Sequence, residues 1–178
     1  QDILENPEVS ANPADRCYHC KNTLFRQILR AAENDGFPVL LDGTNASDDA
    51  GDRPGMRALR ELSVRSPLRE CGLTKAEIRR LSREAGLFTW DKPAYACLAT
   101  RIRTGEEITL QKLKQTEKAE GFLFGLGFRD FRVRMVSNTA KLELREADLP
   151  LLLENREKIV TELRKDYDSV LLNLEVRK

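Results

Sequence analysis

The order of the expected elements predicts an α/β protein built in two parts. In the first part, helices alternate with a short apolar strand, which is typical of part of a layered α/β sheet. In the second part the order is helix, strand, strand, helix and strand, which is typical of a small, separate α+β unit. We place the boundary within residues 93–108, with predicted domains at 1–95 and 96–178.

Composition narrows the possible classes of protein. The 178 residues include 30 Lys and Arg against 29 Asp and Glu, so no global field draws the chain to nucleic acid or to a membrane. The sequence shows neither a membrane-spanning run nor a signal peptide, and four cysteines in a chain of this length argue against a disulfide scaffold. We therefore expect a cytoplasmic protein. Because the chain opens with Gln1, we also expect a fragment of a longer one.

The first helix is expected over residues 17–34, with Asp15 as its N-cap. Leu24, Ile28 and Ala31 recur at helical spacing. Their spacing supports a helix that ends at Gly36.

The stretch FPVLLDG at residues 37–43 is a nearly continuous apolar run, which predicts a strand buried on both faces. Asp42, Gly43 and Thr44 stand at its carboxyl end, where open α/β sheets bind ligands. An ordinary turn explains the same residues, because Asp-Gly is common in turns. A polar loop extends from there to residue 55.

Two further helices are expected over residues 56–62 and 73–87. The second has the clearest signals, because Thr74 and Glu77 form a capping box and Gly86 ends the helix. Its buried stripe is expected to consist of Ile78, Leu81 and Ala85.

The second part begins with an expected helix over residues 109–126. Two strands follow, in FRDFRVRMV (128–136) and AKLELRE (140–146). A long helix is expected after residue 150, and a last strand in SVLLNLEV (169–176).

The cysteines allow more than one interpretation. A zinc ribbon pairs two C-x-x-C knuckles, and only one is present, at Cys17 and Cys20 with His19 between them. A thioredoxin-type dithiol follows a strand, and no strand signal precedes Cys17. Three thiolates, two on one helical turn and one distant, suit an iron–sulfur cluster with one iron free of protein ligands. Buried structural thiols are the alternative.

Cys97 lies in PAYACLATRIRTG, the segment that joins the two parts, and binding sites favour such junctions. The nearby Arg101 is expected to lower the pKa of this thiol and to make it a better sulfur donor. An ordinary buried cysteine between Ala96 and Leu98 is the alternative.

The strand in FRDFRVRMV carries two arginines. Arg132 and Arg134 are expected on one face, and Phe131, Val133 and Met135 on the other. Two adjacent guanidinium groups suit a shared phosphate or carboxylate. A solvated strand face is the alternative.

Glu120 borders the apolar stripe of the helix before this strand. A carboxylate there can pair with the arginines or hold a cation.

Five stretches together resemble the LarE family, the ATP-dependent sulfur-insertion enzymes of the PP-loop superfamily. The likeness follows the family's order over almost the whole chain. The stretches are NPADRCYHCK, LDGTNASDDAGDRPG, RSPLRECGLTKAEIRRLSREAGL, TWDKPAYACLATRI and GFRDFRVR.

The resemblance implies a Rossmann-like PP-loop ATP pyrophosphatase domain, of which residues 1–95 are the remainder, followed by a small α+β domain. The family's SGGxDS phosphate loop is absent from these 178 residues, so we expect ATP chemistry, with its Mg²⁺, only in a longer protein. The implied reaction activates a carboxylate of a pyridinium dicarboxylate mononucleotide as an adenylate, which sulfur then converts to a thiocarboxylate. The product leads to a nickel-pincer nucleotide cofactor used in lactate racemisation.

The family pattern also implies roles for single residues. Members with one relevant cysteine give up its sulfur, and that residue matches Cys97. Members with three carry a [4Fe-4S] cluster, and Cys17, Cys20 and Cys97 match those three, whereas Cys71 falls outside the pattern. The remaining matches are Glu120, Arg132 and Arg134 to the pocket for phosphate and cation, and Asp42, Gly43 and Thr44 to the nucleotide side. A homo-oligomer is expected.

Two rival functions remain at this stage. Another PP-loop sulfurtransferase that thiolates tRNA would use the same adenylate chemistry but would need a basic face for RNA, against which the near-zero net charge counts. A non-catalytic, zinc-stapled interaction module would bind one zinc and no iron.

Overall fold

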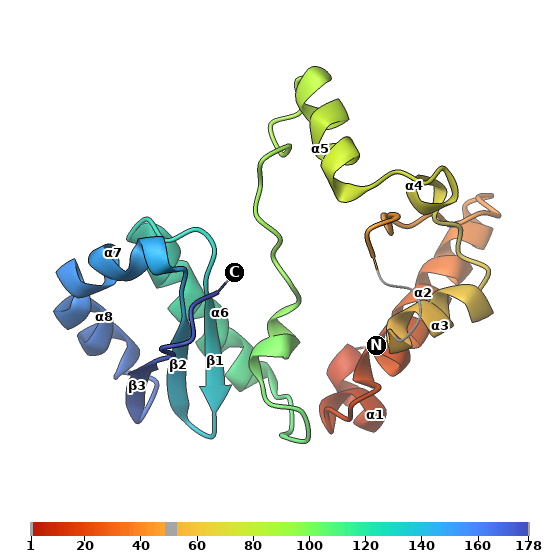
Figure 1. The fold of residues 1–178 in the computed structure, drawn as a ribbon. Coiled ribbons are helices and arrows are strands. Elements are labelled where there is room, and N and C mark those ends of the chain that lie inside the picture. Colours follow the sequence, from red (N-terminus) through yellow and green to blue (C-terminus); the bar gives the residue numbers. More distant parts are fainter. Residues whose placement is uncertain (1, 49–52, 178) are drawn as a thin grey trace. The chain divides into compact units, whose positions relative to one another are not determined.

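The computed structural model describes residues 2–48 and 53–177. The chain divides into two compact units (Figure 1). Unit 1 consists of residues 1–9 and 13–92, and unit 2 of residues 10–12 and 93–178. The assignment of each unit as a functional domain stays a prediction.

Unit 1 is helical in its described residues. Its longest helix, α2 (Arg16–Asn34), packs against α3 (Pro54–Glu61), whose residues Met56, Ala58 and Leu59 are buried. The expected capping box of α5 is confirmed, and Gly86 follows the helix with a positive φ of 71°. The helices are α1 (Pro7–Ser10), α2 (Arg16–Asn34), α3 (Pro54–Glu61), α4 (Pro67–Glu70) and α5 (Lys75–Glu84), with a 3₁₀ turn at Ile3–Glu5.

The extent of α2 agrees with the sequence, but the expected cap by the Asp15 side chain is wrong. Asp15 occupies the N-cap position, but its side chain makes no hydrogen bond to the helix backbone; its carboxylate contacts His19 Nε2 at 3.2 Å instead. Leu24 and Ile28 are exposed, at 39% and 47%. Periodicity identifies an apolar face, but the face is buried only where another element covers it.

The expected buried strand at residues 37–43 is wrong. Phe37 and Leu41 are more than half exposed, at 67% and 62%. Within the described part of unit 1, the backbone pairing of this stretch is a single parallel bridge between Leu41 and Arg65. The buried stripe expected on α5 is also wrong, because Leu81 and Ala85 are exposed. The loop that follows residue 43 lies partly outside the described residues, at 49–52.

Unit 2 has the expected order of elements. Strands β1 (Arg132–Val136) and β2 (Thr139–Glu143) are antiparallel with Val133 opposite Leu142, and β2 and β3 (Ser169–Leu172) are parallel (Figure 1). The long helix expected after residue 150 is two helices, because the chain turns at Asn155, whose side chain donates to the carbonyl of Leu151. The elements are α6 (Leu110–Gly125), β1 (Arg132–Val136), β2 (Thr139–Glu143), α7 (Leu149–Glu154), α8 (Arg156–Leu163) and β3 (Ser169–Leu172), with 3₁₀ turns η2 (Leu98–Arg101) and η3 (Glu146–Asp148).

One continuous hydrophobic core holds unit 2 together. Leu123 of α6 and Phe128 are fully buried in it, and Phe131, Val133 and Met135 enter from the strand as the alternation predicts. The core therefore fixes α6 against β1. No helix among the described residues is both long and apolar enough to cross a membrane.

The core predicts a clear difference between two leucines of unit 2. Leu123 has no exposed surface, whereas Leu153 of α7 is 70% exposed. Leu123→Ala should lower the free energy of unfolding by about 2–5 kcal/mol, since it leaves a cavity. Leu153→Ala should change it by less than about 0.5 kcal/mol. Urea denaturation followed by circular dichroism measures both, and equal losses would contradict the assignment of the core.

Candidate functional site

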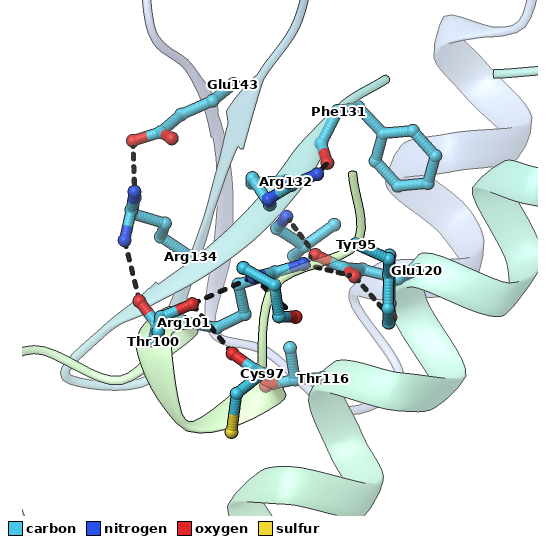
Figure 2. A network of polar contacts seen from close by, with 12 residues as sticks. Tyr95, Cys97, Thr100, Arg101, Thr116, Glu120, Phe131, Arg132, Arg134 and Glu143 are labelled. Atoms are coloured by element: carbon cyan, nitrogen blue, oxygen red, sulfur yellow. Dashed lines mark hydrogen bonds and ion pairs between the residues drawn. The ribbon is translucent and has the colours of Figure 1, made fainter. Parts of the chain in front are cut away.

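Cys97 lies on the surface of unit 2, at the end of a segment without helix or strand. Its carbonyl accepts hydrogen bonds from the backbone N–H of Thr100, at 3.0 Å, and from the Thr100 hydroxyl, at 2.7 Å. These bonds form the η2 turn that follows the cysteine. Figure 2 shows its sulfur pointing away from the polar network beneath the segment. Because Cys97 is exposed, the alternative of an ordinary buried cysteine is wrong.

A buried ion pair lies under this segment. Arg101 Nε donates to Glu120 Oε1 at 2.6 Å, and Arg101 Nη2 donates to Oε2 at 3.0 Å, with both side chains only 1% exposed. The two oxygens of Glu120 also accept from the Val133 N–H at 2.9 Å and the Tyr95 hydroxyl at 2.7 Å. This bidentate geometry and the added donors compensate two charges that have been removed from water.

Arg101 also bonds groups outside the ion pair, and its expected effect on the Cys97 thiol stays a prediction. Its guanidinium also donates to the Thr100 hydroxyl at 2.9 Å (Figure 2). It donates to the Ala96 carbonyl at 3.4 Å as well. These bonds commit the group to Glu120 and to the backbone around the cysteine. The structure therefore gives Arg101 a part in holding the segment, and sequence reasoning found no signal for its pairing with Glu120.

Tyr95 contacts the same ion pair from the segment itself. Its ring lies 5.3 Å from the guanidinium carbon of Arg101 and 6.0 Å from that of Arg132. Burial, followed by the hydrogen bond to the negative Glu120, raises the pKa of Tyr95 to about 12. The hydroxyl therefore stays protonated and acts as a donor at neutral pH.

The arginines of β1 bond to different acceptors. Arg132 donates to the carbonyls of Phe131, at 2.6 Å, and Ala94, at 2.9 Å. Arg134 donates to Glu143 at 2.7 Å and to the Thr100 carbonyl at 2.6 Å. Their side chains are 9% and 42% exposed. A shared anion therefore stays a prediction.

Charge and burial distinguish Arg132 from its neighbour. Burial, followed by the positive charges of Arg101 and Arg177, holds the pKa of Arg132 below its ordinary value. An anion that reached this group would relieve that repulsion.

A second group of predicted residues gathers in unit 1. Cys17 lines a pocket of about 470 Å³ together with Asp42, Gly43 and Thr44. Lys21 is also part of its wall, so the pocket holds a positive side chain beside the turn. The remaining lining residues are Asp48, Arg53, Pro54, Gly55 and Met56. The structure thus brings one predicted cluster ligand next to the three predicted nucleotide-binding residues.

Local hydrogen bonds shape this turn. The Asp42 carboxylate accepts from the Thr44 hydroxyl at 2.5 Å, from the Thr44 N–H at 3.2 Å and from the Ser66 hydroxyl at 2.6 Å. Partial burial acts to raise the pKa of Asp42, but the bonds from Ser66 and Thr44 outweigh it, so the pKa lies below its ordinary value. Asp42 is therefore ionised at neutral pH.

The remaining cysteines differ in their surroundings. Cys17 is exposed, and its sulfur accepts a hydrogen bond from Arg16 Nη2 at 3.4 Å. Cys20, one turn along α2, is half-buried, and Cys71 is exposed at the end of α4. Cys17 and Cys20 belong to unit 1 and Cys97 to unit 2, so a cluster shared by all three stays a prediction.

The buried pair predicts that removing the charge of Glu120 destabilises the fold more than removing the charge of a glutamate in a partly exposed pair. Glu120→Gln should lower the free energy of unfolding by about 3–5 kcal/mol, because it leaves Arg101 charged and buried without a counter-charge. Glu143→Gln is the matched control, since its partner Arg134 is partly exposed, and it should cost about 1 kcal/mol or less. Urea denaturation of both variants provides the measurement, and a Glu120→Gln cost no larger than the control would contradict a tightly coupled pair.

No known family model matches the chain. It is 43% identical over 141 residues to the uncharacterised protein slr1717 of Synechocystis, a match that covers 79% of this chain and 53% of that protein. It is 34% identical over 146 residues to the pyridinium-3,5-bisthiocarboxylic acid mononucleotide synthase of Lactiplantibacillus plantarum, covering 82% of this chain and 53% of the synthase.

A third relative is covered more fully. The chain is 32% identical over 176 residues to the uncharacterised protein MJ0830 of Methanocaldococcus jannaschii, which covers 98% of this chain. The chain thus spans about half the length of the first two relatives and 68% of the third. This identity over such a share of both sequences shows that the chain belongs to the same protein family as MJ0830.

Proposed function

We propose that this chain is part of an ATP-dependent sulfur-transfer enzyme that converts carboxylates of a pyridinium dicarboxylate mononucleotide into thiocarboxylates. The observation that carries the proposal is the 34% identity to a synthase whose name describes such a product. The exposed thiol of Cys97, next to a cluster of arginines, supports it. The product would serve the synthesis of a nickel-pincer nucleotide cofactor.

The chemistry divides into two steps. ATP, with Mg²⁺, activates the substrate carboxylate as an acyl adenylate and releases pyrophosphate. A sulfide that attacks the acyl carbon would expel AMP with the bonding electrons and give the thiocarboxylate directly. If the Cys97 thiolate attacks instead, AMP would leave and a thioester would form. Loss of the Cα proton of Cys97 and cleavage of its Cβ–S bond would then release the thiocarboxylate and leave dehydroalanine. We assign the first step to the full-length protein, in which the pocket at Asp42, Gly43 and Thr44 would form the nucleotide side.

Cys97 is our candidate for the residue that handles sulfur. A thiolate is a strong nucleophile and needs no general base once it is deprotonated. Its exposure leaves it accessible to an activated carboxylate.

The substrate phosphate would bind to Arg132 and Arg134, with Glu120 nearby. A phosphate oxygen is a stronger acceptor than a neutral carbonyl, so it would compete with the bonds of these arginines to Ala94 and Thr100. The Glu120 carboxylate already accepts from Arg101, Tyr95 and Val133. A cation there would have to replace one of these donors.

Cys17, Cys20 and Cys97 would hold the proposed [4Fe-4S] cluster, whose fourth iron would supply a binding place for transferable sulfide. Cys17 and Cys20 fit such a site because they stand one turn apart on α2 and so share a helix face. The thiols of Cys17 and Cys97 are exposed, which leaves both open to a ligand.

The first functional prediction concerns Cys97 in the full-length protein. Cys97→Ser should abolish formation of the thiocarboxylate while adenylation continues, because ATP activation does not use the thiol. Cys71→Ser is the control and should leave turnover unchanged, since Cys71 is an exposed cysteine outside the proposed site. Mass spectrometry of the nucleotide product provides the measurement. Sulfur that appears in tRNA instead of the mononucleotide would contradict the proposal.

The Cys17→Ser variant then separates the two sources of sulfur. If the cluster carries the sulfide, this variant should lose iron and activity together, and Cys97 should keep its mass. If Cys97 spends its own sulfur, the variant should complete one turnover and position 97 should become dehydroalanine, lighter by one H₂S. We expect the first outcome. Iron content and intact mass after a single turnover distinguish them.

A second prediction tests the arginines of β1. Arg134→Ala should weaken binding of a phosphorylated pyridinium nucleotide by about 10-fold or more, because a charged hydrogen bond to the phosphate is lost. Binding of the dephosphorylated nucleoside should change little. Calorimetric titration measures both ligands, and equal losses would show that Arg134 serves the fold through Glu143 and Thr100.

A further inference from the structure

We propose that Tyr95 is a positioning residue that fixes the backbone of Cys97 by anchoring its segment to the buried Arg101–Glu120 pair. The proposal rests on the proposed function only in assigning sulfur chemistry to Cys97. The anchoring contacts lie within unit 2 and can be tested without that chemistry.

The segment of residues 94–97 needs such an anchor because it has no regular structure of its own. Its backbone is held by side chains of other elements rather than by a helix or sheet. Arg132 from β1 donates to the Ala94 carbonyl, and Arg101 from η2 donates to the Ala96 carbonyl. The Cys97 carbonyl accepts two bonds from Thr100. These contacts fix carbonyl groups on either side of Tyr95.

Tyr95 supplies the one long side chain in the segment that reaches this network. Ala94 and Ala96 carry only methyl groups, and the side chain of Cys97 points outward (Figure 2). The Tyr95 hydroxyl donates to Glu120 Oε2 at 2.7 Å, a bond to a charged acceptor and therefore stronger than one to a neutral carbonyl. Its ring lies over the guanidinium groups of Arg101 and Arg132.

The acceptor makes this bond a firm anchor. Glu120 is 1% exposed and is itself fixed by Arg101 and by the backbone N–H of Val133 in the strand. A side chain bound to Glu120 is therefore held in a fixed position relative to both α6 and β1. Tyr95 stands two positions before the cysteine, so the anchor acts close to the thiol without touching it.

This arrangement suits a nucleophile that must stay accessible to its substrate and yet keep a fixed orientation. An exposed thiol on a loose segment would sample many orientations, and misplacement by about 1 Å can lower a rate by about 100-fold. Anchoring the backbone through Tyr95 restricts the thiol without covering it. Tyr95 acts through Cys97 and not on the reacting atoms.

The test measures the mobility of position 97 directly. A nitroxide label is attached to Cys97 in the 178-residue chain with Cys17, Cys20 and Cys71 replaced by serine, and its mobility is read by electron paramagnetic resonance. Tyr95→Phe keeps the ring and removes only the hydroxyl. It should shorten the rotational correlation time of the label by about twofold or more, because one anchoring bond is lost. Tyr95→Ala should have a larger effect.

A matched control lies in the other unit. The Tyr18 hydroxyl also donates to a glutamate, Glu61, at 2.7 Å, and the guanidinium of Arg57 lies 3.7 Å from its ring. Tyr18→Phe therefore removes the same kind of bond and should leave the label at Cys97 unchanged. Circular dichroism and Tm establish that each variant is folded.

A second measurement uses the protein with its native thiols. The N–H of Thr100 bonds the Cys97 carbonyl, and the N–H of Ile102 bonds the Ala99 carbonyl. Hydrogen exchange at these two amides should be about fivefold faster in Tyr95→Phe than in the parent, because local opening becomes easier. Unchanged label mobility and unchanged exchange in folded Tyr95→Phe and Tyr95→Ala would overturn the proposal, whatever the full-length enzyme does with sulfur.

Discussion

The buried ion pair of Arg101 and Glu120 is the interaction on which the arrangement of unit 2 depends. Removing two charges from water is costly, and the cost is met only when every lone pair and donor finds a partner. Here the partners come from Tyr95 in the segment before Cys97 and from Val133 in β1, as well as from the pair itself. The requirement to satisfy one carboxylate thus ties together η2, α6, β1 and the Cys97 segment.

The predicted phosphate-binding arginines of unit 2 are also bonded to protein groups, although not to Glu120. Arg132 and Arg134 bond the carbonyls of Ala94 and Thr100, on either side of Cys97. A phosphate that took both guanidinium groups would release or share those carbonyls. By linkage, the position of the Cys97 segment and the affinity for an anion would influence each other. If the two arginines bind the predicted anion, the geometry of the thiol and the occupancy of the arginine pair would therefore not be independent.

Two short-range signals in the sequence are confirmed, because the interactions they describe are complete within a few residues, whereas the expected cap by the Asp15 side chain is not formed. The two signals are the capping box at Thr74 and the alternation of Phe131, Val133 and Met135. The pairing of Arg101 with Glu120 joins residues far apart in the sequence, and no short-range pattern indicates it. Glu120 itself was identified because a charged residue beside an apolar stripe needs an explanation. Its partner could be found only from the fold.

Unit 1 shows where periodicity stops being informative. An apolar pattern states that a face is suited to burial, whereas burial also needs an element that covers the face. Leu24, Phe37 and Leu41 have the pattern and remain exposed in the described residues. The pocket beside Cys17 takes its shape in part from the hydrogen bonds that Asp42 accepts from Thr44 and Ser66. These bonds form whether or not another element covers the apolar residues. This explains how the turn of Asp42, Gly43 and Thr44 is well defined although the strand expected before it is not formed.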